Sequence, residues 1–352
     1  MEVEGEDSSL SSPLEAPPPF LPSPETLTPS RGSWSEEDLV MSEVHLGCPP
    51  NFSGPHISHF TFSLPPGCKC TDSYEDETAS TVQAVSLDED GDLVLTRSSR
   101  RSKDEIVVTI QHNITSTIPN VGLQVWRAEL ILSDFVLHKM FTSAEFDGIV
   151  AIELGAGTGL VGMLLAYVAK TVFLTDHGDK VLDNCAENVL LNSEMFPSQA
   201  SIQVHELDWK ESWPPKVVEN LPSGERHSWT SADIEELHNA SLIVAADVIY
   251  SDDLTDAFFN TLRRLMMQGP EKVAYIALEK RYNFTLDDLD VVANGYSNFR
   301  SYVRDEEDDL ESKCLPCFVG KRIDLTQVPQ YMREYDRGND VELWHVKYLQ
   351  NH

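Results

Sequence analysis

Hydrophobic and polar positions follow two alternating periods from about residue 105 onward. Short apolar runs that predict strands lie at 105–114, 149–154, 171–176, 201–207, 241–247, 272–280 and 341–349. Between them, apolar residues recur at helical spacing, which predicts helices from Gln124, from Leu160, over 179–192, over 253–267 and near 286–294. Strands that alternate with helices favour an α/β fold with an open, mostly parallel sheet and helices on both faces.

The chain before this pattern has a different composition. Residues 1–80 hold 12 of the 20 prolines, with 14 acidic and 2 basic residues and no sustained period. We therefore expect a disordered, acidic Pro/Ser-rich tail over 1–80, a β-rich lead-in over 81–123 and the main domain over 124–352. Within that domain, 213–239 is too long for a tight connection and predicts an insertion loop, a kind of segment that often touches substrate.

Charge and cysteine content limit the partners and the compartment. The chain has 58 acidic and 26 basic residues, a formal charge of −32, which repels nucleic acids and anionic membranes and favours basic partners. No apolar run approaches the ~20 residues of a membrane span, and the acidic start differs from a secretory signal. We expect a soluble protein of the nucleus or cytoplasm. Four of the six cysteines, Cys68, Cys70, Cys314 and Cys317, are poorly spaced for zinc, so no metal is expected.

The strongest chemical signal is the glycine-rich segment Glu153-Leu-Gly155-Ala156-Gly157-Thr-Gly, where a strand meets a helix. A dinucleotide fingerprint would need glycine at the sixth position from Gly155, but Leu160 stands there. A carboxylate before the loop and another at the end of the next strand, Asp176, suit a ligand without phosphate whose amino and hydroxyl groups need acceptors. S-adenosylmethionine is such a ligand. The alternative is a glycine turn that only packs the strand on the helix.

Taken together, four motifs resemble the seven-strand methyltransferases of family 16, which are mostly protein lysine methyltransferases. They are ELGAGTG, Asp176, the Asp208-Trp209 pair, and the segment from Ala246 and Asp247 to Tyr250. The likeness is dense over about 85–300, looser beyond 300, and absent from the first 80 residues. It implies a Rossmann-like seven-strand fold and S-adenosylmethionine as the cofactor.

The resemblance also implies roles for individual cofactor-binding residues. Gly155, Ala156 and Gly157 would lie against the methionine part, with Glu153 supporting their loop, and Asp176 would accept from the ribose hydroxyls. Asp208 and Trp209 would line the adenine pocket, Ala246 would line the floor of the whole cofactor site, and Trp126 would close the lid. Core packing is the alternative for both tryptophans.

Asp247 and Tyr250 are the candidate catalytic residues. Methyl transfer needs an aligned neutral amine and the exclusion of water, without metal or a covalent intermediate. A lysine arrives mostly as ammonium, so acceptors and aromatic faces must hold it before one proton leaves. We expect Asp247 to orient the amine and Tyr250 to wall the lysine channel. The alternative for Asp247 is capping of the next helix.

These observations favour a protein N-lysine methyltransferase that acts on a basic, lysine-rich protein, such as one that binds nucleic acid, and that works as a monomer. Asp247-Val-Ile-Tyr250 differs from the Pro-Pro-Tyr turn that accompanies adenine or glutamine methylation. Two alternatives stay open. One is a methyltransferase for a non-protein amine, and the other is a binding module that uses the tail and 213–239 to hold a partner such as a chaperone.

Overall fold

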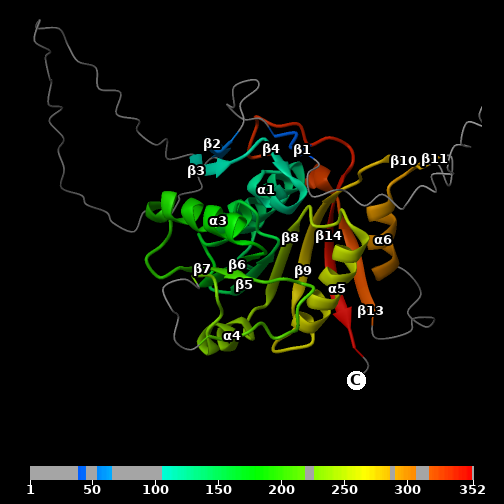
Figure 1. The fold of residues 1–352 in the computed structure, drawn as a ribbon. Helices are drawn as coiled ribbons and strands as arrows, with labels where there is room; N and C mark the ends of the chain where they lie inside the picture. The colour runs from blue at the N-terminus through cyan, green and yellow to red at the C-terminus, as the bar shows by residue number, and fades with distance from the viewer. Residues whose placement is uncertain are drawn as a thin grey trace, which may run out of the picture. The chain divides into compact units, whose positions relative to one another are not determined.

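An eight-stranded sheet organises the chain (Figure 1). The computed structural model describes residues 39–44, 54–65, 105–218, 226–285, 290–306 and 317–350. The strands, in spatial order, are β12 (Val303–Asp305), β13 (Cys317–Ile323), β14 (Val341–Leu349), β9 (Val273–Glu279), β8 (Leu242–Ala246), β5 (Val150–Leu154), β6 (Thr171–Asp176) and β7 (Ser201–Glu206). The strands from β7 to β9 are parallel, and β14 is antiparallel to both of its neighbours. This confirms the mostly parallel sheet, with β12 as a short additional edge strand.

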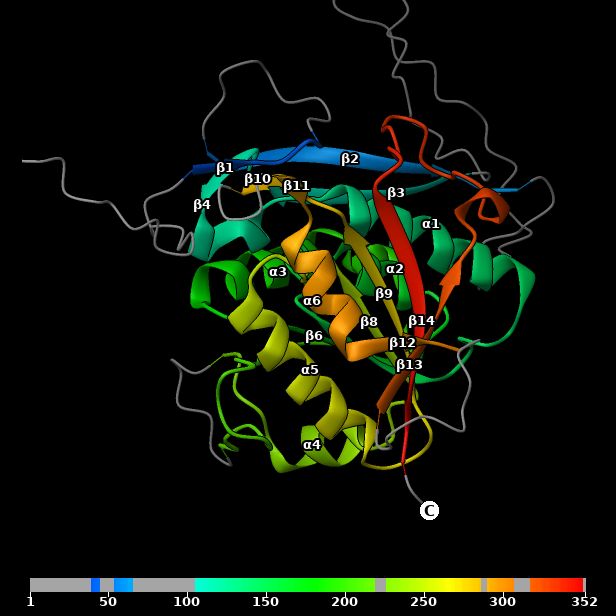
Figure 2. The same cartoon turned by 90° about the vertical axis from the view of Figure 1, so that its right-hand side faces the viewer.

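Helices cover both faces of this sheet. They are α1 (Arg127–Thr142), α2 (Leu160–Leu165), α3 (Asp179–Leu191), α4 (Ser231–Leu237), α5 (Asp252–Met266) and α6 (Asn294–Tyr302). On β6, Val172 and Leu174 join a core cluster with α1 and α2, whereas Phe173 joins a second cluster with α5 and α6. The two clusters lie on opposite faces because successive strand residues point to opposite sides. Figure 2 shows α5 and α6 together on one face.

One predicted helix is wrong. In place of a helix near 286–294, β10 (Asn283–Thr285) pairs antiparallel with β11 (Asp290–Val292), and α6 begins only at Asn294. The apolar positions of this stretch fit either period, and the β-branched residues Thr285, Val291 and Val292 favour strands. Both views place β10 and β11 at the edge of the sheet opposite α4 (Figures 1 and 2). Residues 286–289, between the two strands, lie outside the described ranges.

The predicted disordered tail is also wrong for two stretches. Residues Leu39–Met41 form β1, which pairs with β4 (Thr115–Thr117), and His56–Ser63 form β2, which pairs with β3 (Glu105–His112). Phe60 and Phe62 of β2 are completely buried in the core. Proline and acid content averaged over 80 residues conceals an eight-residue strand whose partner comes more than 40 residues later. The other residues of 1–80 lie outside the described ranges.

Asparagines on α3 hold β3 in place. Asn192 accepts from the Thr109 amide at 2.8 Å and donates to the Thr109 carbonyl at 2.7 Å, as a neighbouring strand would. One turn earlier, Asn188 makes the same pair of bonds with the backbone of Gln111, at 2.7 and 3.1 Å. Asn188 also donates to the Thr158 carbonyl at 3.0 Å. The β2–β3 pair is therefore tied through α3 to the glycine-rich loop.

The predicted insertion 213–239 contains packed structure where it is described. Trp229 is 1% exposed and stacks on His205, with 4.3 Å between ring centroids, and α4 follows it. Both figures place α4 at the edge of the sheet opposite β10 and β11. The segment also reaches the carboxyl end of β7, where the His227 carbonyl accepts from the Glu206 amide at 2.8 Å and Trp229 Nε1 donates to the Glu206 carbonyl at 2.7 Å. Residues 219–225 are outside the described ranges.

Replacing Phe60 with alanine tests whether the β2 stretch is part of the folded core. Phe60→Ala should lower the free energy of unfolding by about 3–5 kcal/mol, the usual cost of removing a buried phenylalanine. The control is Ile57→Ala on the same strand, because Ile57 is 50% exposed. Urea unfolding followed by circular dichroism measures both. Equal, small effects would show that β2 adds nothing to stability.

Candidate active site

The glycine-rich loop connects β5 to α2 in a conformation that side chains disfavour. Gly155, Gly157 and Gly159 have φ of 71°, 51° and 82°. A Cβ on Gly155 would lie 2.6 Å from Val248 and 3.4 Å from the Trp209 ring. The loop therefore needs glycine both for its backbone angles and for its close approach to the turn after β8. Ala156, 3% exposed, is buried within it.

Two carboxylates hold this loop from opposite sides. Asp176, at the end of β6, accepts from the Gly157 amide at 2.8 Å and from the His177 amide at 2.7 Å. Desolvation raises the pKa of Asp176, and these amides oppose the shift. Glu153 is 1% exposed and accepts from the Gly162 amide at 2.9 Å, while burial raises its pKa well above the usual range. Glu153 is therefore bonded to the first turns of α2 inside the core, and Asp176 is bonded to the loop itself at a partly accessible edge.

The Trp209 ring lies next to Gly155. It packs edge to face on Phe258, with 5.3 Å between centroids, and its Nε1 is buried without a hydrogen-bond partner. Asp208 accepts from the Lys210 amide at 2.9 Å and lies 3.8 Å from His177. An unpaired donor and a half-buried carboxylate thus lie close to Asp176. Such a corner fits the polar groups of an adenosine.

Asp247 follows β8 directly in a strained conformation. Its φ is 57°, and among the described residues it is the one non-glycine residue with positive φ. Its side chain is 2% exposed; Oδ2 accepts from Arg281, whereas Oδ1 is buried without a partner. Ser251, not Asp247, occupies the N-cap of α5. The helix-capping alternative is therefore wrong, and Ala246 before it ends β8 half-buried.

Arg281 connects Asp247 to Trp126. Its guanidinium carbon lies 5.1 Å from the centroid of the Trp126 ring, a cation–π arrangement. Trp126 is fixed by its Nε1, which donates to the Val121 carbonyl at 3.1 Å. Desolvation raises the pKa of Asp247, and the Arg281 charge opposes this. A carboxylate, a cation and an aromatic face therefore meet beside the glycine-rich loop.

Tyr250 lies at the outer margin of the same turn. It is 37% exposed, whereas Val248 and Ile249 before it are buried. Desolvation of the phenol raises the pKa of Tyr250 to about 12, and the charges of Asp176 and Asp247 add to the shift. Tyr250 is thus a neutral phenol at physiological pH.

Several charged residues here did not follow from the sequence. Glu43, from the predicted tail, accepts from the Arg127 amide at 2.8 Å, and the Arg127 side chain is ion-paired with Glu279. Glu129 is 5% exposed and accepts from the Thr158 hydroxyl at 2.7 Å. Glu129 could have been identified from the sequence, because a glutamate three residues after the start of a helix often caps that helix. The contacts of Glu43 and Arg281 depend on chain segments that are far apart in the sequence.

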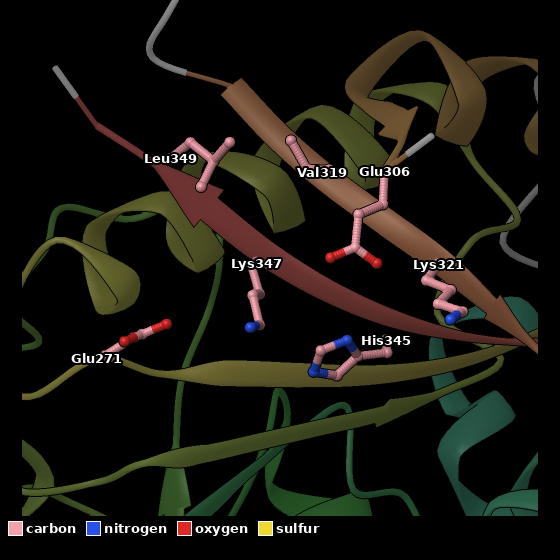
Figure 3. A pocket seen from close by; sticks show the side chains of 7 residues that line it. All are labelled: Glu271, Glu306, Val319, Lys321, His345, Lys347 and Leu349. Carbon is pink, nitrogen blue, oxygen red and sulfur yellow. The ribbon is translucent and has the colours of Figure 1, made fainter. Parts of the chain in front are cut away.

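A hollow of about 270 Å³ lies elsewhere, on the β13–β14 side of the sheet (Figure 3). Its lining comprises Glu271, Glu306, Val319, Lys321, His345, Lys347 and Leu349. Glu271 precedes β9 and Leu349 ends the antiparallel β14, so the hollow extends toward the amino ends of the parallel strands. None of the predicted site residues line it.

The described residues contain neither a metal-binding cluster nor a membrane-spanning helix. Within the described ranges, no group of three or more His, Cys, Asp or Glu side chains could hold a metal ion. Of the four cysteines weighed for zinc, only Cys317 is described, and it is a free thiol. No helix in the described part of the chain is long and apolar enough to cross a membrane.

Glu129 should make stability depend on pH. Desolvation raises its pKa to about 7 from 4.5, against hydrogen bonds from Thr158 and Trp126 that favour the anion. The folded state thus binds more protons between these values, and its stability falls as pH rises. Between about pH 5 and 8 the free energy of unfolding of the wild type should fall by ~2–3 kcal/mol more than that of Glu129→Gln, as measured by urea unfolding. The exposed control Glu187→Gln should follow the wild type, and parallel curves for Glu129→Gln would contradict the assignment.

Comparison with known proteins identifies the family of the chain. Residues 102–223 match a family model described as lysine methyltransferase. Methyltransferase-like protein 22 of Mus musculus is 32% identical over 359 residues, which cover 90% of this chain and 86% of that protein. The Homo sapiens protein of the same name is 32% identical over 366 residues, with 90% and 85% covered. Protein N-lysine methyltransferase METTL21A of Mus musculus is 30% identical over 162 residues, which cover 46% of this chain and 62% of that protein. Since the likeness to methyltransferase-like protein 22 extends over nine-tenths of the chain, the chain belongs to the lysine methyltransferase family.

Proposed function

We propose that this chain transfers a methyl group from S-adenosylmethionine to a lysine of a protein substrate, with the lysine amine bound at Asp247. The observation that carries the proposal is the buried Oδ1 of Asp247, which lacks a partner beside the glycine-rich loop. A carboxylate oxygen in that state is unfavourable unless a donor meets it. A lysine ammonium is a donor of the right charge.

The residues around the loop fit the cofactor. When bound, S-adenosylmethionine supplies an electrophilic methyl group on its sulfonium. We assign the Gly155–Gly157 backbone to its methionine part, the Asp176 carboxylate to the ribose hydroxyls, and the unpaired Nε1 corner of Trp209 with Asp208 to the adenine. Glu153 supports the loop, Ala246 forms the floor and Trp126 closes the lid.

Asp247 and Tyr250 would then prepare the amine. The lysine ammonium must give up one proton before its lone pair can form the new N–CH3 bond. Desolvation raises the pKa of Asp247, so its carboxylate holds a proton more readily than an exposed aspartate does. Tyr250, neutral and at the margin of the site, would wall the channel along which the lysine side chain arrives.

The finer features of the substrate belong to this proposal too. The residues after 80 carry 44 acidic and 24 basic side chains, a balance of −20, which favours a basic, lysine-rich protein, including one that binds nucleic acid. We propose that the chain acts as a monomer in the nucleus or cytoplasm. Contacts with a chaperone remain the prediction of the binding-module alternative.

Loss of the Asp176 carboxylate should weaken cofactor binding. Asp176→Ala removes the acceptor for the ribose hydroxyls and the partner of the Gly157 amide, so affinity should fall by about 1–3 kcal/mol. Isothermal titration calorimetry with S-adenosylhomocysteine measures this. Asp183→Ala, an exposed aspartate on α3, is the control and should bind as the wild type does. Unchanged affinity for Asp176→Ala would contradict the ribose role.

Methyl transfer should require Asp247. The purified chain, incubated with radiolabelled S-adenosylmethionine and a hypomethylated cell extract, should label a band that protease destroys and nuclease does not. Asp247→Ala should reduce this labelling at least about 100-fold, which is the usual effect of removing a general acid or base. Calorimetry should still detect binding of the cofactor to this variant. A label confined to small molecules would favour the non-protein amine, and wild-type labelling by the variant would refute the assignment.

A further inference from the structure

We propose that Arg281 occupies the subsite of the substrate ammonium and must leave Asp247 before a lysine can bind there. Arg281 would be an internal gate that the substrate displaces. This inference rests on the proposed lysine methyltransferase function, which it deepens by naming the chain's own occupant of the lysine site.

The first argument is that Arg281 already makes the contacts expected of a bound lysine. Its guanidinium is ion-paired with Oδ2 of Asp247 and lies 5.1 Å from the centroid of the Trp126 ring. A carboxylate and an aromatic face are the two features that hold a lysine cation before transfer. Both are already engaged by one arginine.

The second argument is access. Oδ1 of Asp247 has no hydrogen-bond partner and no contact with solvent. An incoming amine therefore cannot reach this oxygen unless a neighbouring group moves. The Arg281 side chain is 36% exposed, against 2% for Asp247, so it can swing outward without opening the core.

The third argument is charge balance. Three carboxylates and two arginines surround the subsite: Glu43, Asp247, Glu279, Arg127 and Arg281. Their net charge of −1 favours a cation at this place, and at Asp247 itself Arg281 is the cation that is ion-paired. Exchanging Arg281 for an ammonium keeps the Asp247 carboxylate paired and leaves the net charge unchanged.

The fourth argument is chemical. A guanidinium stays protonated at physiological pH and its nitrogen lone pairs are delocalised, so it is a much weaker nucleophile than a neutral amine. Arginine can therefore occupy the subsite and accept a methyl group far less readily than a deprotonated lysine would. The gate protects Asp247 when no substrate is bound and remains intact itself.

The test compares two adjacent residues that make the same kinds of contact. Lys280 is ion-paired with Glu342 at 2.7 Å and lies 4.5 Å from the Tyr296 ring, so Lys280→Ala is the matched control for Arg281→Ala. Full-length proteins are titrated with n-butylammonium by calorimetry at about pH 8.5, with n-butanol as the neutral probe. Arg281→Gln repeats the test with a side chain that can still donate to Asp247, and melting temperatures establish that each variant is folded.

The gate predicts that n-butylammonium binds Arg281→Ala and Arg281→Gln at least about tenfold more tightly than the wild type or Lys280→Ala. Adding Asp247→Asn to Arg281→Ala should abolish that gain in affinity. The neutral probe n-butanol should bind all of these proteins with the same affinity. With a protein substrate, KM should fall for Arg281→Ala while kcat does not. Equal or weaker probe binding by both Arg281 variants, or a lower kcat at unchanged KM, would overturn the gate and make Arg281 a fixed positioning residue.

The binding experiment also separates this inference from the proposed function. Tighter probe binding without methyl transfer by any variant would support the cation subsite and refute the methyltransferase proposal. Methyl transfer by the wild type, without tighter probe binding by the variants, would refute the gate alone.

Discussion

The reversal of strand order beside β5 is the constraint on which the site depends. From β5 the chain proceeds to β6 and β7 on one side, then returns to place β8, β9 and β14 on the other. Connections leave in opposite directions at such a point, so a crevice opens at the carboxyl ends of the strands. The glycine-rich loop after β5, Asp176 after β6 and Asp247 after β8 all lie there. Their proximity follows from topology, although 92 residues separate Gly155 from Asp247.

The charged side chains at these strand ends then determine what the site can hold. Asp247 is buried in a backbone conformation that costs of order 1–3 kcal/mol for a residue other than glycine. Its partner Arg281 lies against Trp126, and Arg127, Glu279 and Glu43 extend the charges toward the start of α1. Buried ion pairs of this kind add little to stability. Their retention beside the predicted cofactor loop fits a site that exchanges cations.

The early strands show how distant segments complete this arrangement. Ser42 donates to the Val125 carbonyl, and the neighbouring Glu43 accepts from the Arg127 amide. The β2–β3 pair is held by Asn188 and Asn192, and Asn188 also binds the carbonyl of the glycine-rich loop. Segments that composition assigns to a tail therefore hold the residues on both sides of Trp126 and, through β3, are connected to the loop. Such contacts leave no periodic pattern in the local sequence, because each one requires a partner that is distant in the sequence.

The sequence by itself determined the α/β class, most helix and strand positions, and the order of Glu153, Asp176, Asp208 and Asp247 along successive strand ends. The hydrophobic period and the glycine spacing are local properties, so they can be recognised in the sequence of one chain. Only the tertiary structure decided that Leu39–Met41 and His56–Ser63 form strands, that Asn283–Thr285 pairs with Asp290–Val292, and that Arg281 meets Asp247. These features depend on pairing between distant segments and on desolvation, and both arise only when the chain has closed around its core.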